Sequence, residues 1–312
     1  MKLLIAYDGS RSADDAIADL ASAGLPRDAE ATIIAVAEKW LPHLYLADDH
    51  PELEAAARDR RTEAEDQGHI TKGLDEASAL ASHAGETLLK LFPDWIVDVK
   101  TVNGSPALEI LTEAERAAPD LIVMGSQGRT AVGRLLLGSI SQKVLAEAKC
   151  SVRIGRVTPN GKDEKMIVIG FDGSPGSNAA VDAVAARRWR GGCKIFLVTA
   201  SDALVPTAIG RFIPPIVRWV EEEVRTEREL IRKLAESAFH KLGNAGCEVD
   251  LRVRNGNPKQ VIVEEAERLG ADCIFLGANS YGSKLERFLI GSTSTAVAAR
   301  SHCTVEVVRP RP

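Results

Sequence analysis

The 312-residue chain has no excess of positive charge, no long apolar run and few cysteines. Its net charge of -5, without a basic cluster interleaved with aromatic residues, argues against nucleic acid as a partner. No stretch approaches the roughly 18 apolar residues of a membrane span, and the apolar run before Asp8 is too short for the core of a signal peptide. We therefore expect no membrane contact and a cytoplasmic location.

The cysteines number five, an odd count, and none forms a C-x-x-C pair. This usage argues against a disulfide framework or a cysteine-rich zinc site, and it is typical of a reducing compartment. The segment that contains His43, Asp48, Asp49 and His50 has no recognisable ligand spacing, and a solvated acidic loop explains it. We expect no metal site.

What the chain does contain is an internal repeat. Apolar residues make up 45% and charged residues 27%, as in a globular protein long enough for two domains of about 150 residues. Three blocks recur in the same order, which makes chance a poor explanation. The matching blocks are 3–17 with 167–181, 102–126 with 254–278, and 135–156 with 288–309. We place a first domain at 1–157, a polar linker at 158–165 and a second domain at 166–312.

Each half alternates apolar strands with helices. Continuous apolar runs such as LIVM at 121–124 indicate strands buried on both faces, which favours a parallel sheet. The fold class is therefore α/β, with two tandem doubly wound domains, each a five-stranded parallel sheet flanked by helices. In the first half we expect strands near 2–8, 31–37, 96–102, 120–125 and 151–156, and helices near 11–22, 52–90, 106–117 and 139–148.

The second half repeats this order and contains one long helix near 215–242. Its apolar residues keep helical spacing, so we expect them to form core or domain-contact surface. They are Val217, Val220, Val224, Ile231, Leu234, Ala238 and Leu242.

Two features fall where doubly wound sheets bind ligands, outside the carboxyl ends of the strands. The first strand ends in Asp-Gly-Ser at 8–10. Its aspartate can accept hydrogen bonds from a ribose or a base amine, although the triplet is also an ordinary turn that starts a helix. The fourth strand runs into GSQGRTAVGRLLLGS at 125–139, where the glycines permit close approach of the backbone.

The glycines of 125–139 have their own spacing: a glycine, two residues, a glycine, nine residues, then Gly-Ser. The final pair, Gly138 and Ser139, opens the next helix, where free amides and the helix dipole attract anions. No Gly-Lys-Ser or Gly-Lys-Thr follows, so the segment is not a Walker A loop, and it is not a G-x-G-x-x-G dinucleotide fingerprint.

An aspartate after strand one, a G-x-P turn at 104–106 and this glycine spacing after strand four resemble the universal stress protein family, twice and over nearly the whole chain. The resemblance implies an adenine nucleotide alpha hydrolase-like fold without a strong catalytic group. It also implies that the motif wraps the phosphates of ATP while the strand-one aspartate and the second strand hold the nucleoside. ATP, ADP and AMP stay open as ligands, with or without Mg²⁺. The nucleotide-binding residues implied in the first half are Asp8, Val36, Met124, Gly125, Gln127, Gly128, Arg129, Gly138, Ser139, Ile140 and Ser141.

The second half departs from this pattern in GANSYGSKLERFLIGS at 277–292, which holds one more residue between its first and last glycines. An insertion there redirects backbone amides without changing the fold. We expect an intact site in the first half and an altered one in the second, where binding is left open. The residues that remain in place are Asp172, Val198, Gly277, Gly291 and Ser292.

Three functions stay open: a non-catalytic nucleotide-binding protein in stress response or signalling with an unknown protein partner, a weak ATPase, and an adaptor pair without a ligand. Neither half has a histidine at a repeated position to act as a base, which argues against nucleophilic hydrolysis.

Members of the family commonly dimerise through their fifth strands. The resemblance implies that 151–156 and 304–310 pair antiparallel as an internal pseudo-dimer, and that each half alone self-associates. The sequence does not decide whether whole chains also form a homodimer through their long helices. Cys150 and Cys303 stand before the two fifth strands, where we expect packing rather than redox chemistry.

Overall fold

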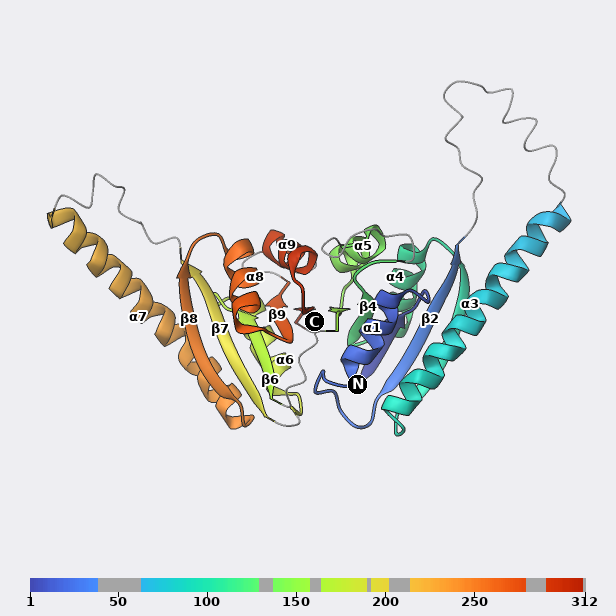
Figure 1. Ribbon diagram of the computed structural model, residues 1–312, viewed down its shortest axis with the longest axis horizontal. Helices are drawn as coiled ribbons and strands as arrows, with labels where there is room; N and C mark the ends of the chain where they lie inside the picture. The colour runs from blue at the N-terminus through green and yellow to red at the C-terminus, as the bar shows by residue number, and fades with distance from the viewer. Residues whose placement is uncertain are drawn as a thin grey trace, which may run out of the picture.

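The computed structural model describes residues 1–38, 63–128, 137–157, 164–189, 192–201, 214–278 and 290–310. The described strands form one sheet in the order β3-β2-β1-β4-β5-β10-β9-β6-β7-β8, with helices on both faces (Figure 1). Strands are parallel within each half, and β5 and β10 join the halves in antiparallel orientation. The expected fold class and the expected pairing of the fifth strands are both present.

The first half contains β1 (Lys2–Ala6), α1 (Arg11–Leu20), β2 (Glu30–Glu38), α3 (Glu63–Leu91), β3 (Ile96–Gly104), α4 (Pro106–Ala117), β4 (Leu121–Gly125), α5 (Ser139–Glu147) and β5 (Ser151–Gly155). The second contains β6 (Lys165–Gly170), α6 (Pro175–Ala185), β7 (Cys193–Ser201), α7 (Pro214–Asn244), β8 (Glu248–Asn255), α8 (Pro258–Leu269), β9 (Cys273–Gly277), α9 (Ser292–Arg300) and β10 (Thr304–Val308). These bounds agree with the sequence-based expectations to within a few residues wherever the chain is described.

The apolar strands are buried on both faces. All five residues of β4 and of β10 are buried, as the continuous apolar runs predicted. One hydrophobic cluster lies under α4, α5, α8 and α9 and runs across both halves, with Val152 and Val305 among its members. On the opposite face each half has its own cluster, under α1 and α3 and under α6 and α7. The halves therefore share a core on one face of the sheet only.

The strand order creates a switch point in each half. In each half the first strand lies between the second and the fourth, so β1 meets β4 and β6 meets β9 at a topological switch point. Loops leaving two such strands diverge to opposite faces of the sheet and open a crevice at the carboxyl ends. Asp-Gly-Ser follows β1 and β6, and the glycine segments follow β4 and β9, so the motifs come together at these crevices.

One prediction for α7 is wrong. Ala238 and Leu242 are buried as expected, and Ile231 is half-buried, but Leu234 is 48% exposed. Ala235, which the predicted stripe omitted, is fully buried instead. The spacing 231, 235, 238, 242 follows 3.6 residues per turn, and Leu234 lies to one side of that stripe beside the loop at Gly173. Val217, Val220 and Val224 have side chains outside the described part.

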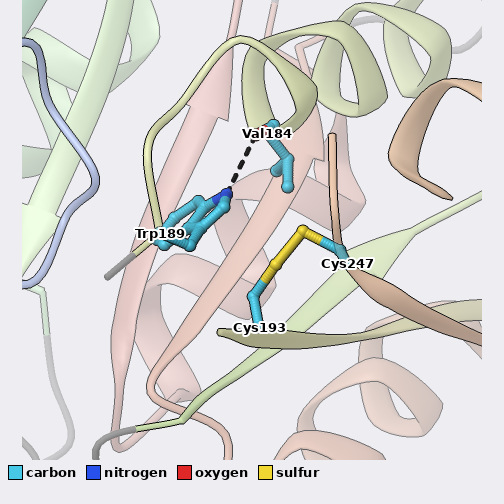
Figure 2. The surroundings of a disulfide bond; sticks show 4 residues. All are labelled: Val184, Trp189, Cys193 and Cys247. Carbon is cyan, nitrogen blue, oxygen red and sulfur yellow. Dashed lines mark hydrogen bonds between the residues drawn. A yellow bond between two sulfur atoms is a disulfide. The ribbon is translucent and has the colours of Figure 1, made fainter. Parts of the chain in front are cut away.

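The cysteine usage argued against a disulfide framework, but one disulfide does form. Cys193, at the start of β7, is bonded to Cys247, immediately before β8 (Figure 2). The two strands are adjacent, and their register pairs Lys194 with Glu248, so the preceding cysteines lie opposite each other with Cα atoms 5.0 Å apart. An odd cysteine count cannot reveal a bond that depends on strand register. Trp189 lies beside the disulfide, and its indole nitrogen donates to the Val184 carbonyl at 3.0 Å.

Candidate functional site

The turn after β1 positions Asp8. The backbone amide of Ser10 donates to Asp8 Oδ1 at 2.9 Å, and Gly9 takes a φ of 75°, which only glycine adopts without strain. The Ser10 side chain then accepts from the amide of Ala13 and caps α1. Asp-Gly-Ser is therefore a turn and a helix cap, and it also fixes the half-buried Asp8 carboxylate at the mouth of the switch point.

The loop after β4 passes so close to α1 that a side chain at its first position would not fit. A Cβ on Gly125 would come within 2.6 Å of the Ser12 backbone carbonyl carbon. Ser12 Oγ accepts from the amide of Gln127 at 3.2 Å and lies 3.3 Å from Ser126 Oγ. The Ser10 hydroxyl donates to the Gln127 carbonyl at 3.4 Å. Hydroxyl groups of α1 and its cap thus anchor the beginning of the glycine segment.

Gly128 brings this loop against Asp8. A Cβ on Gly128 would lie 3.2 Å from Asp8 Oδ2, so a side chain there would fill the space beside the carboxylate. The next predicted residue, Arg129, lies outside the described residues. Asp8 and the described start of the glycine segment thus meet at one point, as their positions in the sequence predicted.

The N-terminus of α5 closes the site. The amide of Gly138 donates to the Ser126 carbonyl at 2.8 Å, and Gly138 then acts as an N-cap without a side-chain hydrogen bond. Ser141 Oγ donates to the Gly125 carbonyl at 2.9 Å, which ties the helix to the end of β4. Ser139 is exposed and Ile140 half-buried. A helix N-terminus that its own cap leaves without a side-chain acceptor has amide donors and a positive dipole end for an anion.

An apolar wall lies below these polar groups. Met124 is buried in the shared core, and Val36, Val102 and Ile140 pack against it while staying partly exposed. Val36 pairs with Val102 in the β2–β3 register, beyond the last residue of β1. A flat ring placed on this wall would have backbone groups of β2 beside it.

The second half repeats the scaffold. The amide of Ser174 donates to Asp172 Oδ1 at 3.0 Å, Gly291 donates to the Ala278 carbonyl at 2.6 Å, and Ser294 Oγ donates to the Gly277 carbonyl at 2.8 Å. A cavity of about 170 Å³ lies here. Its lining includes Asp172, Val198, Ala200, Ile262, Gly277 and Ser294. Ser292 is exposed at the start of α9, and the inserted residue of the loop lies outside the described part.

Strand register revises one assignment in this half. Ala6 pairs with Ile34 in the first half, and Gly170, two residues before Asp172 as Ala6 is before Asp8, pairs with Val198. Val198 therefore matches Ile34, and the counterpart of Val36 is Ala200, two residues further along. Both second-half residues line the cavity. Residue counting agrees with the register, because Val36 follows Asp8 by 28 positions and Ala200 follows Asp172 by 28.

The halves also differ in how the loop is anchored, which sequence reasoning missed. The positions of Ser12 and Ser126 are occupied in the second half by Gly176 and Ala278, which have no hydroxyl. Gly277 approaches Gly176 so closely that a Cβ would come within 2.2 Å of its carbonyl carbon. The first half therefore has two hydroxyl groups at this contact where the second has none, and in the described residues Gly277 faces the backbone of Gly176.

The described residues contain no group of three or more histidine, cysteine, aspartate or glutamate side chains placed to hold a metal ion. The segment with His43, Asp48, Asp49 and His50 lies outside this part of the chain. None of the described helices is both long enough and apolar enough to span a bilayer.

The chain is thus a tandem α/β protein. At each switch point an aspartate, a glycine-containing segment and a helix N-terminus without a side-chain cap lie together. The family model described as Universal stress protein family matches residues 1–156 and 165–309, and the chain belongs to that family. A universal stress protein of Mycolicibacterium smegmatis is 29% identical over 243 residues, 74% of this chain and 77% of that one.

Of two further similar proteins, one matches about half of this chain and the other matches nearly all of it. The protein called universal stress protein in QAH/OAS sulfhydrylase 3'region, from Thermus aquaticus, is 38% identical over 154 residues, 49% of this chain and 97% of its own. The crystal structure of a universal stress protein from Archaeoglobus fulgidus has a TM-score of 0.60 and 21% identity, with 99% of this chain and 96% of that chain covered. This last likeness shows the tandem fold.

Proposed function

We propose that this chain binds an adenine nucleotide, with ATP as the main ligand, and acts in stress response or signalling without strong catalysis. The observation that carries the proposal is the convergence of Asp8, Gly128 and the N-terminus of α5 at the β1–β4 switch point. Crevices of this kind bind nucleotides in doubly wound sheets. Family membership, on a model matching both halves, supports the same reading.

The roles follow from the chemistry of each group. The Asp8 carboxylate accepts hydrogen bonds from ribose hydroxyls, and the base rests on the apolar wall with the backbone of Val36 beside it. The amides at Gly128 and at the start of α5, together with the Ser139 hydroxyl, donate to phosphate oxygens. Gln127 and Arg129 are proposed as further phosphate donors.

We propose that the first half binds more tightly than the second. The support is the pair of differences at the loop: an inserted residue between Gly277 and Gly291, and the loss of the Ser12 and Ser126 hydroxyls. A phosphate cradle depends on the direction of individual amides, so a less anchored loop loses more conformational entropy when it closes around a ligand. The cavity beside Asp172 leaves room for a weaker second site.

Mass spectrometry of freshly purified protein, denatured on injection, tests the proposal directly. Release of an adenine nucleotide supports it and identifies the number of phosphates. Absence of nucleotide, together with no binding at millimolar ATP, supports the adaptor function instead. Repeating the binding measurement with EDTA in place of Mg²⁺ shows whether the metal accompanies the nucleotide.

The alternative of a weak ATPase makes a different prediction. If the chain hydrolyses ATP, turnover will exceed the uncatalysed rate and will fall on Asp8→Ala or Ser139→Ala substitution while the protein stays folded. We propose that phosphate release from the wild type and from both variants is indistinguishable from the rate in buffer. A wild-type rate clearly above those of both variants would establish the enzyme.

A further inference from the structure

The two halves meet on an axis that passes through one pair of residues. In the third matching block of the repeat, 135–156 with 288–309, equivalent residues are 153 positions apart, as Cys150 and Cys303 are. Arg153 and Glu306 therefore occupy equivalent positions in the two halves. The β5–β10 register pairs these same two residues opposite each other. Equivalent positions that face each other must lie on the approximate two-fold axis between the halves.

One set of contacts away from this axis is the same in both directions. Arg156 donates to the carbonyls of Ala298 at 2.7 Å and Cys303 at 3.2 Å, at the end of α9. Its counterpart, Arg309, donates at 2.7 Å and 3.1 Å to the matching carbonyls of Leu145 and Cys150, at the end of α5. Since both halves carry arginine here, this clasp would form equally well between two first halves or two second halves.

The pair on the axis is different, because the two halves carry opposite charges there. Arg153 donates to Glu306 Oε2 at 2.9 Å and to Asp19 Oδ2 at 2.7 Å, and all three side chains are buried. Arg187 donates to the other oxygen of Glu306, and its second amino group donates across the interface to the Ala23 carbonyl at 2.8 Å. The first half thus brings an arginine to the axis and the second half a glutamate.

Like pairing would place equal charges on the axis. Two first halves joined through β5 in the same register would bring Arg153 against its own copy, and two second halves joined through β10 would do the same with Glu306. Asp19 and Arg187 would each still neutralise one charge within its own half, but the Arg153–Glu306 bond would be lost. Like charges at a desolvated contact cost far more than at a surface, and such a contact rejects wrong partners.

We propose that the β5–β10 edge is a partner-selective interface, in which Arg153 and Glu306 select the opposite half of the chain and exclude a second copy of the same half. The Arg156 and Arg309 clasp supplies attraction without selectivity. This arrangement argues against the expectation that each half alone self-associates. In the tandem chain, β5 pairs with β10 of the same chain, so neither strand edge is left to pair with another molecule.

Cleavage of the folded full-length protein tests this without relying on isolated halves. A protease site inserted between 157 and 164, beside the exposed Val157, separates the halves after folding and removes the advantage of the linker. The cleaved protein is mixed with an isotope-labelled copy, incubated until the label has exchanged, and examined by native mass spectrometry. We expect pairs of one first half with one second half, and like pairs at least about tenfold below the statistical mixture.

Two matched variants of the same cleavable protein separate selectivity from affinity. Arg153→Gln with Glu306→Gln places the same neutral amide on both sides of the axis, where it still bonds to Asp19 and Arg187. Like pairs should then rise well above their level in the cleaved wild type, while the contact of Arg187 with the Ala23 carbonyl still favours unlike pairs. Arg156→Gln with Arg309→Gln removes the symmetric clasp, so the pairs should dissociate more readily yet remain unlike. Circular dichroism before cleavage confirms that each variant is folded.

Statistical amounts of like pairs in the cleaved wild type would overturn the proposal. So would an Arg153→Gln, Glu306→Gln double variant that still forms only unlike pairs, since the selection would then come from shape and not from the charges on the axis.

Discussion

At the scale of single residues, burial decides which side chains are reactive. Burial raises the pKa of the Cys150 thiol to about 11 and that of Cys303 to about 12, and the nearby Arg309 and Arg156 offset only part of this effect. Burial likewise raises the pKa of Cys273, against the attraction of Arg153. A thiol held in its protonated form is a poor nucleophile and a poor metal ligand. The expectation of packing without redox chemistry at Cys150 and Cys303 agrees with these shifts.

Counting thiols tests this residue-level account. The native protein should react very slowly with Ellman's reagent near neutral pH, because its three free thiols are protonated and largely buried. Denatured without reductant it should release three equivalents, and five after reduction, since Cys193 and Cys247 are bonded. A full count of thiols before reduction would show that the disulfide does not form in the isolated protein.

Arg153 is the single residue whose loss should be most costly. Burial lowers its pKa, but attraction to Asp19, Cys273 and Glu306 reverses this and raises it well above the usual range, so the guanidinium stays charged. Removing one member of a buried ion pair leaves the others uncompensated and typically costs about 3–5 kcal/mol. Urea unfolding of Arg153→Ala should show a loss of this size.

The matched control is Lys149→Ala, which removes an exposed ion pair with Glu115 just before the same strand. Surface pairs contribute about 0–1 kcal/mol, so this variant should unfold close to the wild type. Equal losses in the two variants would mean that the axis network adds nothing beyond a surface contact.

At the scale of elements, a repeated ion pair holds the helix after the third strand to that strand. Glu113 on α4 accepts from Arg116 and from Lys100 of β3, and in the second half Glu265 on α8 accepts from Arg268 and from Arg254 of β8. Hydrogen bonding from Arg116 lowers the pKa of Glu113 despite its burial. For Glu265, burial raises the pKa, but the hydrogen bonds from Arg268 and Arg254 lower it by more than burial raises it, so the pKa lies below its usual value.

These shifts predict a loss of stability in acid. A carboxyl whose folded pKa lies below its usual value of 4.5 contributes its full stabilisation at neutral pH and loses it as the pH falls through the folded pKa. The free energy of unfolding, measured from pH 7 to pH 3, should therefore decline most steeply below about 4.5. Glu113→Gln and Glu265→Gln should each flatten that decline. A wild-type profile that is level through this range would contradict the assignment.

The elements also show what the sequence could and could not predict. Strands such as β4 were predictable because LIVM is buried on both faces, and α1 and α5 were predictable from the Ser10 and Gly138 caps. The assignment of Ala200 in place of Val198 was available from the sequence, because Ala200 follows Asp172 by the same 28 positions as Val36 follows Asp8. The disulfide was not, since it depends on which residues of neighbouring strands face each other. Register arises from contacts between distant segments, which no local pattern encodes.

The candidate site shows the same division. Asp8, Gly128 and Gly138 could be singled out from the sequence, because Asp8 follows the first strand and the two glycines lie between the fourth strand and the next helix. Ser12 and Ser126 were not, because a serine at a helix start is expected at the surface until its hydroxyl is seen to anchor a loop more than a hundred residues away.

At the scale of the whole molecule, the interface and the two candidate sites share helices. The N-terminus of α5 closes the first site, while its C-terminal carbonyls are held by Arg309 from the other half. The N-terminus of α9 lies at the second site, and Arg156 holds its C-terminal end. Figure 1 shows α5 and α9 side by side where the halves meet. A nucleotide bound at either proposed site would therefore contact a helix that is anchored across the interface.

Calorimetric titration of ATP into the wild type, Asp8→Ala and Asp172→Ala tests the central claim most directly. The account predicts a dominant site that is lost in Asp8→Ala and nearly unchanged in Asp172→Ala, because the anchored glycine segment belongs to the first half. Far-UV circular dichroism of both variants controls for folding. Two equal and independent sites in the wild type, or a dominant site that survives Asp8→Ala and disappears in Asp172→Ala, would contradict it.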